Sequence, residues 1–576
     1  MQTQRNRFLF IYLLCASTIG LFGCTKSTTT SQQTGVTKYT LTISALSNGQ
    51  IGGASSGGTY ALGSQVALTA TPNNGYSMGS WTGDAAACGS QTSCTLTIAG
   101  NVTVGATFTA NQYTLTITAP SNGVITGASS GTSYAYGTSV TLGSYGIGAY
   151  GLSAWTGDAS SCGSAASCTF TINGNKTVSA AFATAPVGFG AGTTGGAGGE
   201  TVTVTTLAGL KAALCATSSG GVCTDTAARI IQLAGVIDFT GSEGTTTALA
   251  CQYSQNNCTN SAGKFEQILN VTSYCSGKTI YSLTYDTAGS PSNALLVGSN
   301  KTLIGIGTGA QIKGKGISIS GGVSNVIIRN LSITDINDGI IWAGDAILIA
   351  NASKVWIDHN YFARVGRQMI VSGWDKATDV TISNNYIDGT DDYGYFCNGK
   401  HYWNFLLLAT NENFTVIGNW FHNTSGRSPE VGQLSTSTLG VVHMVNNYYD
   451  GNYYTGGING NMYVTEFAEG NTFTSTGYYF PVALDGSSDL VVAPLAGNLS
   501  TLNSTCATLL DRSCIANTTA SSSTYNTGFI LSDTSLTDLE QSSSWASGIA
   551  IVHPMDVSDV ATHVQTHAGP QQNPDL

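Results

Sequence analysis

The sequence is poor in charged residues. Only 9% of its 576 residues are Asp, Glu, Lys or Arg, against about 25% in an average soluble domain. The 20 Lys and Arg residues form no cluster, and the formal net charge is -11. Nucleic acid is therefore not expected as a partner, because its binding requires cationic side chains that neutralise phosphates. The 72 glycines and 26 tyrosines favour strands joined by turns instead.

The N-terminal apolar run is too short to span a bilayer. It extends from Phe8 to Phe22 and follows Arg5 and Arg7, whereas a spanning helix needs about 20 apolar residues. This pattern predicts an export signal over residues 1–24 that is removed on maturation.

The end of this signal is similar to a bacterial lipobox. The residues Leu21-Phe22-Gly23-Cys24 imply that Cys24 becomes a lipidated amino terminus, which tethers the protein to a membrane by acyl chains. Residues 25–38 would then form a polar linker. A secreted protein with an incidental Cys24 is the alternative, and in both cases we expect an extracellular monomer.

The cysteines indicate an oxidising compartment. Of the 14 cysteines, one lies in the predicted signal and one is Cys24, which leaves twelve for disulfides. None has the spacing with histidine that a zinc finger requires. Short loops predict the pairs Cys88–Cys94, Cys162–Cys168 and Cys506–Cys514. The pairing of the others stays open: Cys215, Cys223, Cys251, Cys258, Cys275 and Cys397.

Two tandem repeats precede the main domain. Residues 39–110 and 111–184 match at a constant offset of 74, which relates Trp81 to Trp155. Each begins with alternating residues (YTLTISALSNG, YTLTITAPSNG) and continues through a Gly/Ser turn to W-T-G-D and a cysteine pair, which predicts a small all-β module. The repeats resemble the internalin B-repeat-like modules of bacterial surface proteins, a likeness that specifies no ligand.

Four residues of the repeats are candidates for binding. Trp81 and Trp155 are expected in the module cores, with a sugar platform as the alternative. Asp84 and Asp158 follow glycine and are expected as turn residues, with calcium binding as the alternative. We interpret the modules as spacers or weak carbohydrate contacts.

Residues 186–576 carry a different repeat. VWIDHNYF, VTISNNYI, FTVIGNWF and VHMVNNYY each place an asparagine five residues after an apolar start, at Asn360, Asn385, Asn419 and Asn447. The spacings of 25, 34 and 28 residues fit one solenoid coil each, with uneven loops on one face. Asparagine tolerates left-handed backbone and can hydrogen-bond to its equivalent in the next coil. The sequence therefore predicts an all-β protein whose third domain is a right-handed parallel β-helix.

This third domain resembles the pectate lyase and pectin lyase family of polysaccharide lyases. The likeness covers roughly residues 186–570 and is carried by RIIQLAGVIDF, KTLIGIG, VIIRNLSI and VWIDHNYF. It implies the β-helix and a site on its outer wall that cleaves a uronic acid polymer. In this family, pectate lyases hold Ca²⁺ with several carboxylates, and pectin lyases cleave methyl-esterified polymer without metal.

The resemblance favours the metal-independent branch. Calcium requires about six to eight oxygen ligands, but VGRQMIVSG has Arg367 and Val371 where pectate lyases have a Glu and an Asp. IIWAGDA, RVGRQ, CNGKHYW and GRSP resemble the pectin lyases in order and spacing. We therefore expect no cofactor and pectin as the partner, with Ca²⁺ only under the alternative of a pectate lyase.

β-Elimination needs a base over C5 of the sugar and positive charge near its carboxyl oxygens. By resemblance Arg427 is the base, Arg367 is the electrophilic stabiliser, and Asp345 holds one or both guanidinium groups. Arginine is ordinarily protonated, and a second cation nearby favours loss of its proton. Separations of 22 and 60 residues predict all three on neighbouring coils. An ion-pair network with only a structural role is the alternative.

Five further residues accompany this set. Trp342, Tyr402 and Trp403 are candidates for stacking on the sugars, with burial as the competing explanation. Asp358 and His359 belong to the WIDH segment, which by resemblance braces the fold rather than acting in acid–base catalysis.

One segment departs from the family pattern. GRSPEVG carries Glu430 where pectin lyases usually have lysine, and Gly432 where pectate lyases have a second arginine. An anion three residues from Arg427 disfavours loss of the arginine proton and repels free uronates. We therefore expect a strict preference for highly methylated pectin or reduced activity. A surface lipoprotein that binds pectin without cleaving it is the alternative from another class.

Overall fold

The computed structural model describes most of the chain in two compact units. The described residues are 35–253, 264–432, 440–453, 457–460, 465–474, 490–497, 499–519 and 548–572. One unit comprises residues 1–112 with 135–137, and the other comprises 113–134 with 138–576. The predicted signal and Cys24 lie outside the described residues. Within the described ranges no helix is long and apolar enough to cross a membrane.

The first repeat folds into two small sheets, with strand orders β3-β1-β7-β5 and β2-β4-β6. Trp81 is 2% exposed in the core, and its indole N–H donates to the carbonyl of Gln91 at 2.7 Å. The elements are β1 (Lys38–Ile43), β2 (Gly49–Gly52), β3 (Gly58–Ala61), β4 (Gln65–Pro72), β5 (Tyr76–Gly83), η1 (Ala86–Cys88), β6 (Ser93–Thr97) and β7 (Val102–Ala110).

The second repeat has the same plan, with strand orders β10-β8-β14-β12 and β13-β11-β9. Trp155 is again buried and donates to the carbonyl of Ala165, so both tryptophans are core residues. Asp84 and Asp158 each accept a backbone N–H at 2.7 Å, from Thr103 and Thr177. The elements are β8 (Gln112–Ile117), β9 (Gly123–Thr126), β10 (Thr132–Ala135), β11 (Ser139–Gly146), β12 (Tyr150–Gly157), η2 (Ser160–Cys162), β13 (Ser167–Thr171) and β14 (Lys176–Thr184).

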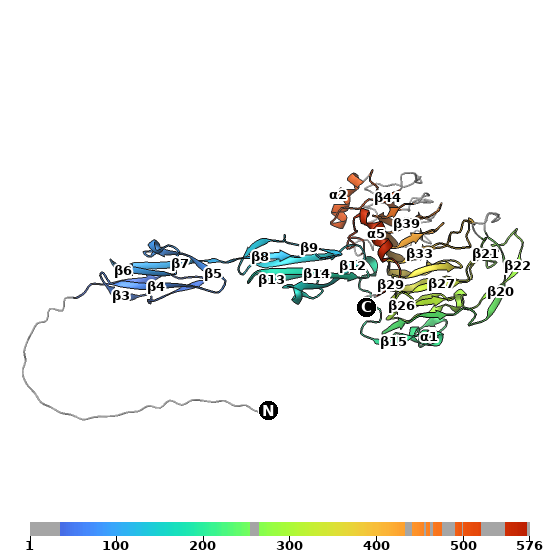
Figure 1. The fold of residues 1–576 in the computed structure, drawn as a ribbon, viewed down its shortest axis with the longest axis horizontal. Coiled ribbons are helices and arrows are strands. Elements are labelled where there is room, and N and C mark those ends of the chain that lie inside the picture. Colours follow the sequence, from blue (N-terminus) through green and yellow to red (C-terminus); the bar gives the residue numbers. More distant parts are fainter. Residues whose placement is uncertain are drawn as a thin grey trace, which may run out of the picture. The chain divides into compact units, whose positions relative to one another are not determined.

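The rest of the second unit is a parallel β-helix, as predicted. Its long sheet runs through successive coils from β15 to β43, and Figure 1 labels β15, β26 and β29 of this path. The main path is β15 (Glu200–Val204), β18 (Arg229–Leu233), β24 (Lys301–Gly305), β26 (Ile317–Arg329), β29 (Ile347–Asp358), β32 (Ala377–Ser383), β35 (Glu412–Ile417), β38 (Gly440–Val445), β41 (Thr465–Glu469) and β43 (Leu490–Val492).

A branch of the long sheet continues from the first half of β29, and a second sheet closes each coil. The branch is β31 (Ile370–Gly373), β34 (Phe405–Leu408), β37 (Glu430–Val431) and β40 (Asn459–Gly460), and β23 (Leu295–Leu296) pairs with β26. The second sheet is β19 (Val236–Asp238), β25 (Gln311–Lys313), β27 (Ser332–Ile336), β30 (Tyr361–Val365), β33 (Tyr386–Asp388), β36 (Trp420–His422), β39 (Tyr448–Asp450), β42 (Thr472–Phe473) and β44 (Thr518–Thr519).

Apolar side chains of equal register fill the inside of the coils. One column consists of Ile328, Ile357, Ile382, Val416 and Met444, each paired with the next across adjacent strands. All five are fully buried. Burial of aliphatic groups stabilises such a core by about 25 cal/mol per Å² of apolar surface, so the repeated apolar positions of the sequence fix the register of the stack.

The predicted asparagine ladder is present and continues beyond the predicted residues. The amide of Asn385 donates to Asn419 at 2.9 Å, and the amide of Asn419 donates to Asn447 at 3.0 Å. The ladder extends to Asn471 and Asn517. The expected left-handed backbone is instead at the residue before five of the ladder asparagines, all except Asn517: His359, Asn384, Gly418, Asn446 and Gly470 have positive φ. The ladder residues themselves need a side-chain amide, because its NH₂ group donates to one neighbouring coil while its carbonyl oxygen accepts from the other.

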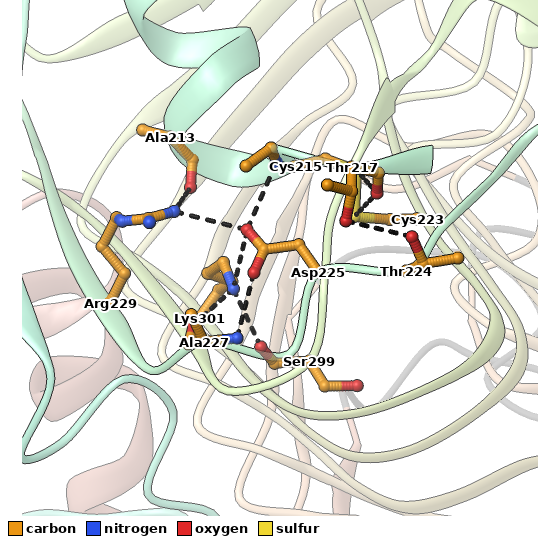
Figure 2. The surroundings of a disulfide bond; sticks show 11 residues. Ala213, Cys215, Thr217, Cys223, Thr224, Asp225, Ala227, Arg229, Ser299 and Lys301 are labelled. Carbon is orange, nitrogen blue, oxygen red and sulfur yellow. Dashed lines mark hydrogen bonds and ion pairs between the residues drawn. A yellow bond between two sulfur atoms is a disulfide. The ribbon is translucent and has the colours of Figure 1, made fainter. Parts of the chain in front are cut away.

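One end of the stack is capped by α1 (Leu207–Leu214), which lies beside β15 in Figure 1. Thr206 accepts from the N–H of Gly209 and so caps the helix. Figure 2 shows the Cys215–Cys223 disulfide next to Asp225, whose carboxylate is 3.4 Å from the ammonium of Lys301. Burial lowers the pKa of the Lys301 ammonium, and the charge of Asp225 and its hydrogen bond oppose this shift. The disulfide thus closes the loop that follows the cap helix, and the ion pair joins this loop to Lys301 in β24.

A small sheet in the order β22-β20-β21-β28 stands beside the branch strands. The Cys251–Cys275 disulfide staples it, and Cys506–Cys514 closes a loop near the other end of the stack. Cys88–Cys94 and Cys162–Cys168 are bonded as predicted. Cys397 is also disulfide-bonded, and Cys258 lies outside the described residues. The remaining elements are η3 (Gly188–Gly190), β16 (Ser218–Ser219), β17 (Val222–Cys223), β20 (Thr245–Gln252), β21 (Gln267–Leu269), β22 (Tyr281–Asp286), η4 (Pro291–Asn293), β28 (Ile340–Ile341), α2 (Leu499–Leu510) and α5 (Val557–His567).

The ladder predicts a large loss of stability for Asn419→Ala. The substitution leaves the buried backbone N–H of Asn385 without its acceptor and removes the bonds of the Asn419 amide to Asn447 and to the carbonyl of Ile382. Each unsatisfied buried polar group costs about 1–3 kcal/mol. We expect the β-helix to lose about 3 kcal/mol or more in denaturant unfolding. Asn74→Ala is the control, because Asn74 is an exposed residue of the first module. Equal stability of the two variants would contradict the claim that the ladder stabilises the β-helix.

Candidate functional site

The predicted site residues lie in successive turns along one edge of the branch. Asp345 precedes β29, Arg367 precedes β31 and Arg427 precedes β37, each by two or three residues. Between the last two lies the turn before β34, which carries Trp403. Asp345 and Arg367 are therefore on neighbouring coils as predicted, but Arg427 is two coils beyond Arg367. At about 4.8 Å per strand, their backbones are about 10 Å apart.

Backbone hydrogen bonds hold these turns in register. The N–H of Arg367 donates to the carbonyl of Gly344 at 2.9 Å, and the N–H of Phe405 donates to the carbonyl of Arg427 at 2.7 Å. The parallel ladder thus continues through the turns, so the side chains project from fixed positions. Arg427 itself has a positive φ of 41°, a conformation that non-glycine residues adopt mainly where the surroundings impose it.

Asp345 binds one of the two guanidinium groups. Its carboxylate accepts from Nε and Nη2 of Arg367, both at 2.9 Å, and from the backbone N–H of Gln368. The Arg367 guanidinium also lies over the ring of Trp342, 3.8 Å from its centroid. A bidentate carboxylate and an indole leave this cation little freedom.

Arg427 has a different pair of partners. Its Nε forms an ion pair with Glu430, and its guanidinium lies 4.5 Å from the ring centroid of Trp403. The side chains of Arg427 and Glu430 are 20% and 10% exposed, so the pair stands at the wall of the site and not in bulk solvent. Glu430, not Asp345, is therefore the carboxylate on the predicted base.

A buried glutamate that the sequence did not single out supports Trp403. Both carboxylate oxygens of Glu266 accept from the indole N–H of Trp403, at 3.1 and 3.2 Å. Burial raises the pKa of Glu266 to about 7, although the charge of His401 and the bond from Trp403 oppose this. Glu266 comes from the start of β21, 137 residues before Trp403, and no local spacing connects them.

Both arginines line one cavity of about 330 Å³. Its aromatic walls include residues missed in the sequence, namely Tyr253, Tyr274 and Trp374, the last 66% exposed. Tyr402 is not among the residues that line it. Its ring packs against Gly426, where an added Cβ would lie 2.4 Å from the ring, and against Trp403. Of the three predicted platforms, Trp342 and Trp403 line the cavity, whereas Tyr402 packs against Trp403.

The floor of the cavity does not fit calcium. It is formed by Val371, Leu406 and Leu408, which belong to one apolar cluster. Calcium takes about six to eight oxygen ligands, and the residues at this floor supply aliphatic groups beside the Arg367 cation. Among the described residues, no three His, Cys, Asp or Glu side chains are grouped to hold a metal.

Asp358 and His359 lie away from this cavity and brace the coils. Asp358 is fully buried and binds Nε of Arg329 at 2.8 Å and Nδ1 of His359 at 2.6 Å. Burial opposes ionisation, but His359, Arg329 and Ser383 together lower the pKa of Asp358 to about 2. This carboxylate remains ionised and structural, as the sequence analysis expected.

The chain belongs to the pectate lyase family. Residues 252–573, more than half of the chain, match the family model described as pectate lyase. Residues 39–112 and 113–186 match the divergent InlB B-repeat domain. The two matches correspond to the two modules and to the β-helix described above.

The most similar relatives include fungal pectin lyases. Probable pectin lyase F-1 of Aspergillus terreus is 44% identical over 262 residues, which are 46% of this chain and 64% of the relative. Probable pectin lyase A of Neosartorya fischeri is 40% identical over 351 residues, 60% of this chain and 85% of the relative. The chain thus spans less than two thirds of the length of the first relative.

Solved structures with a similar course of the chain include two bacterial pectate lyases. Pectate lyase II of Xanthomonas campestris pv. campestris is 19% identical with a TM-score of 0.41, and the match covers 68% of this chain and 100% of that chain. The pectate lyase of Acidovorax avenae subsp. citrulli is 18% identical with a TM-score of 0.37, covering 68% and 95%.

The contact between Glu266 and Trp403 predicts a spectroscopic titration near pH 7. Ionisation of the carboxylate against the indole N–H changes the emission and near-ultraviolet circular dichroism of Trp403, and Glu266→Gln removes that change. Glu412→Gln is the matched control, since burial also raises the pKa of Glu412 to about 8 but its partners are Ser372 and Ala409. A transition that persists in Glu266→Gln would show that another group produces it.

Proposed function

We propose that this protein cleaves methyl-esterified pectin by β-elimination. The observation that carries the proposal is the pair of arginines on one cavity wall, each stacked on an indole and held by its own carboxylate. Such a site supplies positive charge and a candidate base at fixed positions, as the reaction requires. The relatives named pectin lyases support the same substrate.

In the proposed reaction, the neutral form of Arg427 removes the proton from C5 of a galacturonate methyl ester. The electrons of the C5–H bond form the C4=C5 double bond, and the C4–O4 bond breaks. Arg367 donates hydrogen bonds to the ester carbonyl oxygen, where negative charge develops. The departing O4 takes a proton from water, the resulting hydroxide takes the C5 proton from protonated Arg427, and the product carries a 4,5-unsaturated end. Asp345 keeps Arg367 in the orientation that this contact needs.

The lining of the cavity supports an ester rather than a free acid as the substrate. The methyl group can pack on the apolar floor formed by Val371, Leu406 and Leu408. Glu430 places a negative charge beside Arg427, which disfavours a second carboxylate at the same site. The ester also acidifies C5 without a metal, so we propose a reaction that is independent of Ca²⁺.

We further propose that the protein acts outside the cell. The five disulfides among the described residues support an oxidising compartment, and a polymer of this size has to be cleaved there. The finer proposal is a monomer tethered through lipidated Cys24, which lies outside the described residues. Loss of membrane association in Cys24→Ser is the test of the anchor.

The first functional prediction concerns the two cavity arginines. Arg427→Ala and Arg367→Ala are each expected to lower kcat on methylated pectin by about 10²–10⁴-fold, the usual contribution of a general base or an oxyanion donor. The measurement is the ultraviolet absorbance of the unsaturated product in excess chelator. Arg364→Ala is the control, because Arg364 pairs with Asp335 and does not line the cavity.

The same assay separates the alternatives. Loss of wild-type activity in chelator, with turnover of polygalacturonate restored by Ca²⁺, would favour a calcium-dependent pectate lyase. Retention of the protein on immobilised pectin without any unsaturated product would favour a binding protein. Either result would contradict the proposed function.

The second functional prediction concerns Glu430. Glu430→Gln removes the acidic side chain that pairs with Arg427. Activity on polygalacturonate relative to methylated pectin should increase, because a free carboxylate is no longer repelled. The measurement is the ratio of kcat/KM for the two substrates. An unchanged ratio would show that Glu430 does not select the ester.

A further inference from the structure

His401 belongs to the CNGKHYW motif but has no role in the reaction described above. It lies in the loop between β33 and β34 and is 2% exposed. Its Nε2 is 2.8 Å from the carbonyl oxygen of Arg367 and 3.0 Å from that of Trp403. Its Nδ1 is 3.2 Å from a carboxylate oxygen of Asp391. The imidazole is thus enclosed by three acceptors.

This set of acceptors determines the protonation state of the ring. A neutral imidazole carries one N–H and would direct the lone pair of its other nitrogen at an acceptor. Only the imidazolium, with a proton on each nitrogen, satisfies Asp391 and both carbonyls at once. An unmet hydrogen bond inside the protein costs about 1–3 kcal/mol, so the geometry by itself favours the charged ring.

The charges around His401 act in the same direction. Burial lowers the pKa of the imidazole, but the hydrogen bond and charge of Asp391, the charge of Glu266 and the carbonyl of Arg367 outweigh it and raise the pKa to about 9. Asp338 shares a hydrogen bond with Asp391, and burial together with that neighbouring carboxylate raises the pKa of Asp338 to about 8. At neutral pH Asp338 is therefore protonated and lies beside Asp391 as a neutral hydrogen-bond partner.

His401 connects the coils that carry the two arginines. Its side chain holds the carbonyl of Arg367, one coil earlier, and the carbonyl of Trp403 in its own coil. Its backbone carbonyl accepts from the N–H of Ser425 at 2.8 Å, two residues before Arg427. One residue thus contacts the backbone of all three turns that form the cavity wall.

We propose that the His401 imidazolium is a positioning residue that fixes the spacing between Arg367 and Arg427. The proposal rests on the function proposed above, since the spacing matters for the sugar that binds between the two guanidinium groups. His401 touches neither substrate nor reacting atoms. It acts through the two carbonyls and through Trp403, on which Arg427 is stacked.

The proposal sets an upper pH limit on the site. A histidine whose folded pKa lies above its ordinary value of about 6.5 stabilises the folded protein fully below that value. This contribution is lost as pH rises through about 9. The neutral ring has a single N–H, so it loses its hydrogen bond either to the two carbonyls or to Asp391. Asp338, with a pKa of about 8, and Glu266, with a pKa of about 7, also titrate in this range, and the nitrogen signals of His401 distinguish its transition from theirs.

The test uses Asp391→Asn, which keeps the shape of the partner and removes its charge. The wild-type kcat on methylated pectin is expected to fall as pH rises through about 9 with little change in KM. In Asp391→Asn the fall in kcat is expected at least one pH unit lower, while kcat at pH 6 stays within a few-fold of the wild type. Asp450→Asn is the matched control, because Asp450 binds His422 at 2.7 Å outside the cavity.

A second measurement does not depend on activity. Nitrogen NMR of histidine-labelled protein, with His401 assigned by comparison with His401→Gln, is expected to show both ring nitrogens protonated at pH 7 and a lower midpoint in Asp391→Asn. A neutral His401 at pH 7 would overturn the proposal, as would an Asp391→Asn variant whose kcat falls by the same factor at every pH. If the protein cleaves no pectin but His401 is charged, the proposed function is wrong, whereas the assignment of His401 as a charged positioning residue is confirmed.

Discussion

The hydrogen-bonded register between coils is the constraint on which the rest of the structure depends. Each coil repeats the backbone of the one before it, so a turn residue in one coil has its counterpart about 4.8 Å away in the next. Asp345, Arg367, Trp403 and Arg427 occupy such turns at one edge of the branch strands. Arg367 and Arg427, which are 60 residues apart in the sequence, thereby line one cavity. The asparagine ladder and the apolar columns maintain that register from the opposite side.

Within this frame the site consists of two units of the same design. In each unit a guanidinium lies on an indole and is bound by a carboxylate, Asp345 for Arg367 and Glu430 for Arg427. Partly buried cations held in this way keep their orientation without relying on solvent. Aliphatic side chains form the floor where a calcium site would need oxygen ligands. The two units differ in that Glu430 is adjacent to the proposed base. Its position favours a methyl-esterified polymer over one with free carboxylates.

The sequence predicted what recurs along the chain. Asparagine spacing indicated the β-helix, and cysteines six or eight residues apart indicated three disulfides. The resemblance placed Asp345, Arg367 and Arg427, but not the coil of Trp403 between the arginines. Contacts between segments far apart were missed, because neither periodicity nor motif relates Glu266 to Trp403. Trp374 was missed for a similar reason: an exposed tryptophan has no sequence signal that distinguishes it from a buried one.

The most direct measurement is a structure of the Arg427→Ala variant with a fully methylated oligogalacturonide. The account predicts one sugar with its ester carbonyl oxygen within hydrogen-bond distance of the Arg367 guanidinium, its methyl group on the apolar floor, and its C5–H directed at the turn before β37. A sugar chain bound with its ester turned away from Arg367, or bound outside the cavity, would contradict the central claim that the two arginine–indole units act together on one residue of the polymer.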